Sequence, residues 1–185
     1  MFDRLTGLDV PWGSVHIFQV DERVAPDGDA DRNAVQLASH LLNVVPIKRS
    51  NVHLMPVTAV SLARAAARYA HALGDEPLDI VHLGIGDDGH TASWPPGDPV
   101  IDSTEQVAIS DVFNGRVRMT LTPPTVNRAR ARIVLATGAA KAEPLSGWLL
   151  HRAALPIERV RRTNTTVIAD IAAAGQLALR SQRAR

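Results

Sequence analysis

The sequence contains no cysteine, and this absence excludes several kinds of chemistry at once. Without thiols the chain forms no disulfide bonds, no thiolate metal sites and no cysteine nucleophile. A chain without cysteine also suits a reducing compartment, so we expect a cytoplasmic protein. No apolar run approaches the ~20 residues of a membrane-spanning helix, and the N-terminus lacks the basic and then apolar order of a signal peptide. We therefore expect no membrane partner.

A large net charge is missing as well. The 20 lysines and arginines nearly cancel the 19 aspartates and glutamates, which leaves a formal net charge of +1. This balance gives no basis for binding nucleic acid. The 185 residues, of which 45% are hydrophobic, are enough for one domain with a sizeable core. We therefore expect a single domain over residues 1–185 that acts on a small molecule as a monomer or weak homo-oligomer.

Patterns typical of metal sites are also missing. The seven histidines include no pair at the helical spacing that zinc hydrolases use. Asp27, Asp29 and Asp31 imitate the start of a calcium loop, but Arg32 stands where that loop needs glycine and Ala38 where it needs a bidentate acid. We therefore predict no metal, and interpret the three aspartates as a polar loop that caps a helix.

Apolar runs separated by turn residues predict an α/β domain in which strands alternate with helices. The predicted strands cover residues 15–20, 51–55, 80–83, 107–110, 117–121, 133–136 and 166–169. The predicted helices cover residues 31–42, 56–73 and 140–152, and an alanine-rich helix follows the last strand. Two prolines end the strand 117–121, and those after the strand 80–83 forbid regular structure there.

The stretch 79–93 concentrates the chemistry of the chain. It begins as an apolar run, interpreted as a buried strand of a parallel sheet, and ends in a glycine-rich turn with carboxylates, hydroxyls and His90. Ligands of parallel sheets gather at the carboxyl ends of strands, which makes His90 the best catalytic candidate. The spacing of Gly84, Gly86 and Gly89 matches the dinucleotide fingerprint, but the prolines that follow leave no room for its helix. The glycines instead favour close approach of the backbone to a small anionic or carbonyl ligand.

Other candidates have two interpretations each. The triplet 21–23 is either a surface salt-bridge cluster or, because it follows a strand, part of a site. Lys141 at a predicted helix start opposes the helix dipole and is explained by a bound anion, although a plain surface lysine remains an alternative. Arg118 is similarly ambiguous. His16 and His82 lie within predicted strands and are interpreted as packed core or satisfied polar residues.

Three separated segments carry motifs that together indicate one family. Residues 15–33 hold VHIFQVDER and then DRN, residues 83–93 read LGIGDDGHTAS, and residues 118–142 hold RMTLT and then TGAAKA. In this order they resemble the motifs of the 6-phosphogluconolactonases, and the resemblance covers most of the chain. The related glucosamine-6-phosphate deaminases carry a tyrosine where Arg23 stands, which favours the lactonase branch.

The resemblance implies a Rossmann-like three-layer α/β/α sandwich with a mostly parallel sheet. It implies hydrolysis of 6-phospho-D-glucono-1,5-lactone to 6-phosphogluconate in the pentose phosphate pathway, without metal or organic cofactor. His90 matches the family's general base, a task that suits the near-neutral titration of imidazole. Asp88 beside it is the second catalytic candidate. The alternatives are a glucosamine-6-phosphate deaminase/isomerase-like enzyme and an inactive sugar-phosphate-binding relative.

The resemblance also assigns the substrate-binding residues. Arg118 and Lys141 match positions associated with the sugar phosphate, and Asp21 and Arg23 match the triplet that lines the site. Backbone N–H groups from Gly86 to Gly89 are our expected donors to the developing oxyanion.

One feature of the family is missing from this sequence. Family members begin with a strand and a GGSTP-type loop that grips the phosphate. The absent part would be a strand–loop–helix unit of roughly 40 to 50 residues. Either this sequence starts late, or the domain is N-terminally shortened. In the second case we expect an open sheet edge and a phosphate affinity that depends on Arg118 and Lys141.

Overall fold

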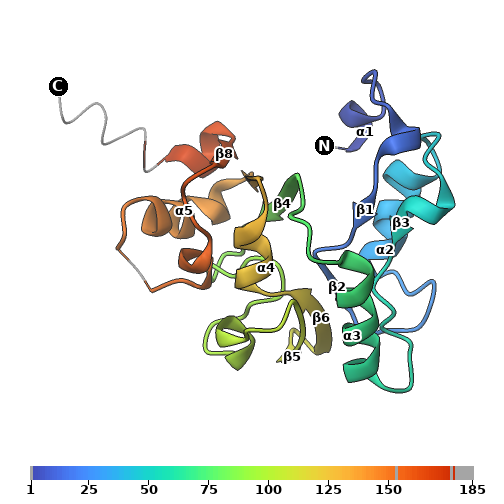
Figure 1. Cartoon of the computed structure of the whole chain (residues 1–185). Coiled ribbons are helices and arrows are strands. Elements are labelled where there is room, and N and C mark those ends of the chain that lie inside the picture. The colour runs from blue at the N-terminus through green and yellow to red at the C-terminus, as the bar shows by residue number, and fades with distance from the viewer. Residues whose placement is uncertain (1, 153, 176, 178–185) are drawn as a thin grey trace.

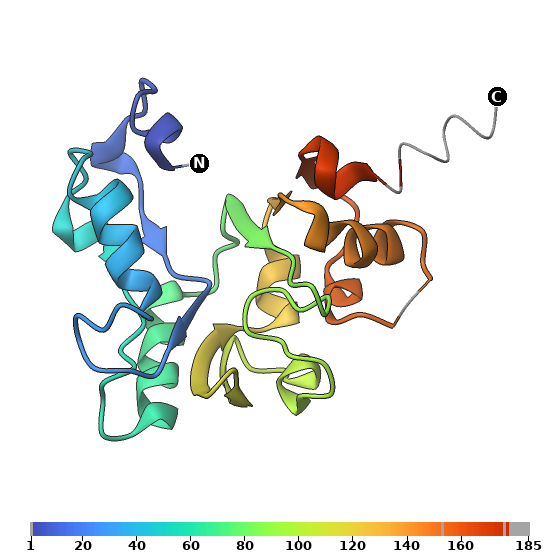
Figure 2. The same cartoon turned by 180° about the vertical axis from the view of Figure 1, so that it is seen from behind.

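The computed structural model describes residues 2–152, 154–175 and 177. Elements from the N-terminal half gather on one side of the molecule, those near the C-terminus lie on the other, and β4 (Ile80–Gly84) runs between them (Figures 1 and 2). The other strands are β1 (Ile17–Phe18), β2 (Asp21–Arg23), β3 (Val52–His53), β5 (Val107–Phe113), β6 (Arg116–Leu121), β7 (Ala131–Ala136) and β8 (Thr165–Ala169). The helices are α1 (Phe2–Leu5), α2 (Asn33–Leu37), α3 (Leu62–Leu73), α4 (Pro123–Arg128) and α5 (Ala142–Leu149).

The strands form three sheets rather than one. β1 pairs with β3, and β4, β7 and β8 form a second sheet in that order; all of these pairings are parallel. The third sheet, in the order β2-β6-β5, is antiparallel. The predicted α/β class with parallel strands is confirmed, although the parallel strands are divided between two sheets. Among the described strands β4 pairs only with β7.

Two predicted elements have other boundaries in the structure, and one helix was missed. The predicted strand 15–20 is only two residues long and is followed by a separate strand β2. The helix predicted from residue 56 begins at residue 62, because the Ser61 hydroxyl accepts the N–H of Arg64 (3.4 Å) and caps it there. Helix α4 was missed, although its two prolines occupy the first helical turn, where no N–H partner is needed.

Helix α2 starts at residue 33 and continues as a π-helical turn to Leu42, so the predicted helix exists. Its predicted cap, Asp31, was wrong. The carboxylate of Glu22 on β2 accepts the N–H groups of Asn33 (2.7 Å) and Ala34 (2.8 Å). A residue eleven positions away in the chain therefore satisfies the helix start.

The parallel sheet β4-β7-β8 has one buried face and one open face. On the buried face Val81 and Val134 are 1% and 0% exposed, whereas Ile80 and Ile168 on the opposite face are 61% and 50% exposed. Strand β4 is thus parallel, as predicted, but only alternate residues are buried. The first part of the predicted final helix is helical from residue 171 to 175, and the rest lies mostly outside the described residues.

The antiparallel sheet is enclosed more completely. The last four residues of β6 are all buried, and Met119 and Leu121 belong to the main hydrophobic core. Trp94 is fully buried against this sheet and donates its indole N–H to the carbonyl oxygen of Leu121 (2.7 Å). The loop after β4 is therefore tied to the antiparallel sheet.

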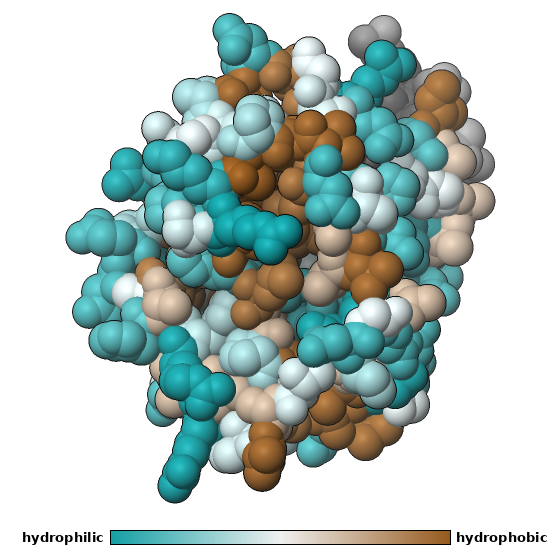
Figure 3. All heavy atoms as spheres, turned by 90° about the vertical axis from the view of Figure 1, so that its right-hand side faces the viewer, coloured by the Kyte–Doolittle hydropathy of each residue, from teal (hydrophilic) through white to brown (hydrophobic). Residues whose placement is uncertain are grey.

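A second, smaller apolar cluster lies between α1, β1 and the helical turn after α2. Its buried members are Trp12, Leu41 and Val45. Figure 3 views the side of the molecule that carries these elements, and apolar atoms reach the surface there among polar ones. No helix within the described residues is long and apolar enough to span a bilayer.

Candidate active site

The loop after β4 folds back on itself and presents His90. The N–H of Gly86 donates to the carbonyl oxygen of His90 (2.7 Å), and the N–H of Gly89 donates to that of Gly86 (3.1 Å). Gly89 has φ of +80°, which favours glycine, and a Cβ there would lie 2.7 Å from the side chain of Leu155. These two amides are used inside the loop, so they are already engaged among the N–H groups from Gly86 to Gly89 that we expected to hold an oxyanion; for the other amides of this stretch the expectation stays a prediction.

His90 and Asp88 form a close pair. The ring Nδ1 of His90 lies 2.5 Å from Oδ1 of Asp88, and that oxygen also accepts the backbone N–H of His90 (3.0 Å). Burial disfavours the ionised carboxyl, but these two hydrogen bonds outweigh it and lower the pKa of Asp88 below its ordinary value. An ionised Asp88 accepts the Nδ1 proton, which leaves the lone pair of neutral His90 on Nε2.

Gly86 makes this pair sterically possible. A Cβ on Gly86 would lie 2.1 Å from Nδ1 of His90 and 2.6 Å from Oδ1 of Asp88. Real atoms do not approach so closely, so any side chain at this position would displace the imidazole or the carboxylate. The glycine is therefore required by close packing within the loop.

Strands β2 and β6 bring two arginines and one carboxylate to the same place. Arg23 and Arg118 are directly opposite in the antiparallel register, as are Asp21 and Thr120. The Ser93 hydroxyl donates to Oδ2 of Asp21 (2.7 Å), which links the loop to β2. Burial raises the pKa of Asp21 above its ordinary value, although the Ser93 hydrogen bond and the two arginines act in the opposite direction.

Arg118 is the least satisfied cation of the site. It is 6% exposed, and its Nε has no hydrogen-bond partner among the described residues. Its guanidinium lies over the ring of Phe113, with Cζ 5.0 Å from the ring centroid. Burial, and then the neighbouring Arg23, lower the pKa of Arg118, while Asp21 acts against them. A buried guanidinium beside a second arginine is best explained by an anionic ligand.

The middle residue of the triplet has a different task. Glu22 is fully buried, forms an ion pair with the equally buried Arg32 (3.1 Å), and accepts hydrogen bonds from Gln19 and from three backbone N–H groups. Burial opposes its ionisation, but the hydrogen bonds prevail and lower the pKa of Glu22. The interpretation of the triplet as a surface salt-bridge cluster was therefore wrong: its outer residues line the site, and Glu22 stabilises the fold.

These groups surround one cavity of about 270 Å³. Among its lining residues are Asp21, Arg23, Asn33, His82, His90, Arg118 and Lys141, together with the backbone of residues 83–86. Six of the eight predicted site residues therefore line one cavity. Asp88 and Gly89 are outside this lining and form hydrogen bonds with His90 and Gly86, which belong to it. Three of the lining side chains are cationic and one is a carboxylate, so the cavity favours an anion.

The cavity lining includes residues that were not among the predicted site residues, such as His82 and Asn33. His82 was interpreted as packed or satisfied within its strand, but its side chain is exposed and lines the cavity. Asn33 lies at the start of α2 and donates to the carbonyl oxygen of Asp21 (3.0 Å). The alternation of β4 would have placed His82 on the same face as Ile80, opposite the core.

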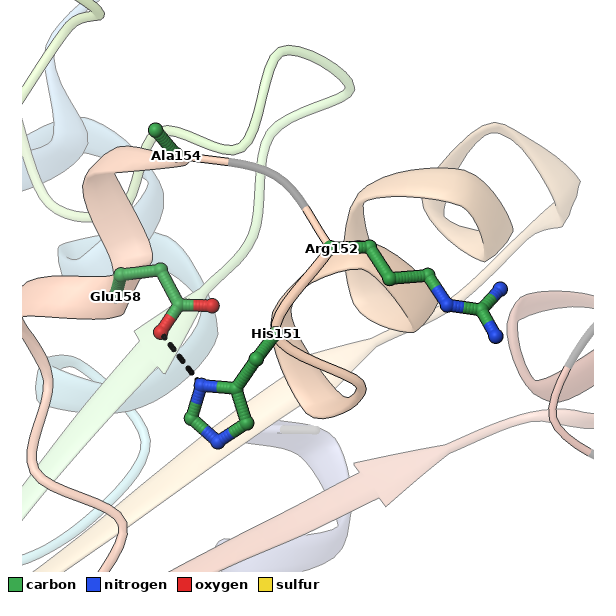
Figure 4. Close-up of a pocket in the computed structure, with 4 residues that line it drawn as sticks. All are labelled: His151, Arg152, Ala154 and Glu158. Carbon is green, nitrogen blue, oxygen red and sulfur yellow. Dashed lines mark ion pairs between the residues drawn. The ribbon is translucent and has the colours of Figure 1, made fainter.

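Figure 4 shows a larger hollow of about 340 Å³ elsewhere on the molecule, lined by His151, Arg152, Ala154 and Glu158. Nδ1 of His151 lies 3.7 Å from Oε2 of Glu158, and the imidazole is 69% exposed. We place the site at the smaller cavity, because only there do buried charged groups converge. Among the described residues, no cluster of three or more histidine, aspartate or glutamate side chains is arranged to hold a metal ion.

Comparisons with known proteins agree with these motifs. A family model described as glucosamine-6-phosphate isomerases/6-phosphogluconolactonase matches residues 1–169. A 6-phosphogluconolactonase from Synechocystis is 32% identical over 154 residues, which cover 78% of this chain and 64% of that protein. The chain thus spans slightly less than two thirds of that relative.

Solved structures show the same fold. The structure of 6-phosphogluconolactonase from Thermotoga maritima matches with a TM-score of 0.82 and 26% identity, covering 91% of this chain and 78% of the other. A monomeric glucosamine-6-phosphate deaminase matches with a TM-score of 0.82, covering 94% of this chain and 81% of the other, but at 19% identity it shows the fold alone. The expected Rossmann-like α/β fold is confirmed.

Proposed function

The chain belongs to the family of glucosamine-6-phosphate isomerases and 6-phosphogluconolactonases, and on that premise we propose that it hydrolyses 6-phospho-D-glucono-1,5-lactone to 6-phosphogluconate. One observation carries the proposal: the His90–Asp88 pair meets, at one cavity, the guanidinium of Arg118, whose Nε has no hydrogen-bond partner among the described residues. A base and an anion site on the same cavity suit a substrate with an electrophilic ester carbon and a phosphate.

His90 acts as the general base. Its Nε2 takes a proton from a water molecule while the water oxygen forms a bond to the lactone carbonyl carbon. Asp88 holds the ring in the tautomer that leaves Nε2 free, and its negative charge stabilises the imidazolium that forms. The tetrahedral intermediate then breaks its bond to the ring oxygen, which takes a proton from the imidazolium, and the opened acid leaves. Atoms and protons balance with water as the only co-reactant.

The cationic side of the cavity binds the phosphate. Arg118 offers a buried guanidinium with an unpartnered Nε, and Arg23 and Lys141 line the same cavity. Hydrogen bonds between guanidinium and phosphate are charge-assisted and stronger than neutral ones. Asp21, held by Ser93 and flanked by both arginines, limits the positive charge and accepts hydrogen bonds from sugar hydroxyls.

The test compares the purified chain with His90→Ala in hydrolysis of the lactone, above the spontaneous rate. Loss of a general base is expected to lower kcat by roughly 10²- to 10⁴-fold. His71→Ala is the matched control, because His71 is an exposed histidine on α3 and should leave the rate unchanged.

Equal rates for the wild type and His90→Ala would refute the proposal. Binding of 6-phosphogluconate in a calorimeter without any turnover would instead identify an inactive sugar-phosphate-binding relative. Release of ammonia from glucosamine 6-phosphate, with no lactone hydrolysis, would identify the deaminase/isomerase branch.

A further inference from the structure

Phe113 contacts both functional halves of the site. Its ring meets the imidazole of His90 edge to face, with centroids 5.0 Å apart and an interplanar angle of 72°. The guanidinium of Arg118 lies over the same ring, with Cζ 5.0 Å from the centroid. Phe113 thus joins the base of the β4 loop to the cation of the antiparallel sheet, although no sequence motif marked it.

We propose that Phe113 is a positioning residue that sets the placement of His90 relative to Arg118, and so the spacing between the base and the anion-binding group of the cavity. The proposal rests on the proposed function, because it concerns the same cavity. Phe113 acts through its contacts with His90 and Arg118 and does not touch the reacting atoms.

A β-bulge places Phe113 where it can do this. In the β5–β6 ladder Ser110 pairs with Arg118, but Phe113 pairs with Arg116, so β5 holds one extra residue between these pairs. In a regular ladder Val112 would lie opposite Arg116, and Phe113 would point to the other face. The extra residue instead puts Phe113 on the face of Arg118 and leaves Val112 69% exposed.

The hairpin that carries Phe113 is anchored at its tip. Asn114 and Gly115 form the turn with φ of +50° and +76°, as two-residue hairpin turns require. The guanidinium of Arg116 lies 3.2 Å from a carboxylate oxygen of Asp29 and 3.1 Å from one of Asp31. These ion pairs hold the tip against the loop after β2, so the ring keeps its place.

The geometry also explains why a ring is needed. The face of an aromatic ring attracts a guanidinium electrostatically, and Arg118 has no hydrogen-bond partner at Nε to hold it instead. Edge-to-face contact then restricts the imidazole of His90. An aliphatic side chain of similar size fills the space but offers no such electrostatic attraction.

The experiment is a substitution series read by separate values of kcat and KM for the lactone. Phe113→Ala is expected to lower kcat roughly 10- to 100-fold, because small misplacement of reacting groups has effects of that order, and to raise KM. Phe113→Leu should recover the melting temperature but only part of kcat, and Phe113→Tyr should restore both. Val112→Ala, at the neighbouring exposed position, is the control that should change neither.

A second readout does not depend on turnover. Removing the aromatic ring should shift the ring-proton NMR resonances of His90 and the Nε–H resonance of Arg118, while Val112→Ala leaves them in place. Full activity in Phe113→Ala, or Phe113→Leu equal to wild type in kcat and KM, would overturn the proposal, and so would unshifted resonances. A wild-type chain without lactonase activity but with the expected NMR shifts would refute the proposed function and leave the positioning contact standing.

Discussion

The two three-stranded sheets contribute to the site in different ways. The parallel sheet β4-β7-β8 supplies its chemistry from a loop after the end of β4, where His90 and Asp88 are two residues apart. The antiparallel sheet β2-β6-β5 supplies Asp21, Arg23 and Arg118 from within its strands. The pair of imidazole and carboxylate thus comes from a compact turn, whereas the charge of the cavity depends on the register of a ladder.

The sheets also differ in what they bury. The parallel sheet buries mainly aliphatic side chains on one face, with Arg132 as the charged exception, and leaves the other face open, while the antiparallel sheet buries Glu22, Arg118 and Thr120 inside the molecule. Buried polar groups are strongly destabilising when they lose a partner, so substitutions in the two sheets should have very different effects. Glu22 and Arg118 represent opposite cases. Both carboxylate oxygens of Glu22 accept hydrogen bonds, whereas Nε of Arg118 has no hydrogen-bond partner among the described residues.

The largest effect on stability is expected for Glu22→Ala. It leaves Arg32 buried without its ion-pair partner and removes the acceptor of the first N–H groups of α2. Breaking a buried pair in this way destabilises by about 3–5 kcal/mol, which urea unfolding would measure. Glu76→Ala, at an exposed position, should change the free energy of unfolding by about 0.5 kcal/mol or less.

The same carboxylate predicts a pH dependence. Because the pKa of Glu22 is lowered in the folded state, its contribution is fully present above the unfolded value of about 4.3 and is lost as pH falls through the folded value. The variant Glu22→Gln should not show this decrease in stability when the pH is lowered. If the free energy of unfolding fell equally with pH in the wild type and in Glu22→Gln, Glu22 would not be the ionised, hydrogen-bonded group that the comparison of the two sheets assumes.

Arg118→Met should behave in the opposite way. It removes a buried cation whose Nε has no partner, so the free energy of unfolding should stay equal or rise by about 1 kcal/mol. The lost charge-assisted hydrogen bonds to phosphate, each about 1.5–3 kcal/mol, should raise KM roughly 10- to 150-fold. Arg68→Met on the exposed side of α3 is the control. A destabilisation as large as that of Glu22→Ala would mean that Arg118 is partnered in the folded protein.

The smallest effect is expected on the open face of the parallel sheet. Ile168→Thr, at a half-exposed position, should change the free energy of unfolding by about 0.5 kcal/mol or less. Val134→Thr in the same sheet buries an unpartnered hydroxyl and should destabilise by about 1–3 kcal/mol. Similar losses for the two variants, measured by urea unfolding, would show that the open face is covered in solution and would remove the contrast.

The part of the proposed site around His90 is local in sequence. His90, Asp88 and Gly86 lie within five residues, so their contacts follow from the conformation of one turn. The sequence nevertheless did not show that the N–H of Gly86 donates to the carbonyl oxygen of His90, which engages one of the expected oxyanion donors. A motif identifies which groups are near one another but not which hydrogen bonds they use.

The parts that were missed depend on distant contacts. Glu22 caps a helix that begins eleven residues later, and Phe113 reaches the site because of one extra residue in β5. Neither fact has a signature in composition or spacing. The helix cap by Glu22 and the placement of Phe113 depend on burial and on strand register. Both contacts form only when the partner helix or strand is already in place.

The amino-acid sequence by itself determined the α/β class, the glycine-rich turn and the pairing of an imidazole with a carboxylate, because short-range sterics and hydrogen bonds settle these. Only the tertiary structure decided that Arg23 and Arg118 face each other, that Ser93 binds Asp21 from 72 residues away, and that Phe113 lies between base and cation. Strand register and packing fix such contacts, and they arise only when the whole chain encloses a common core.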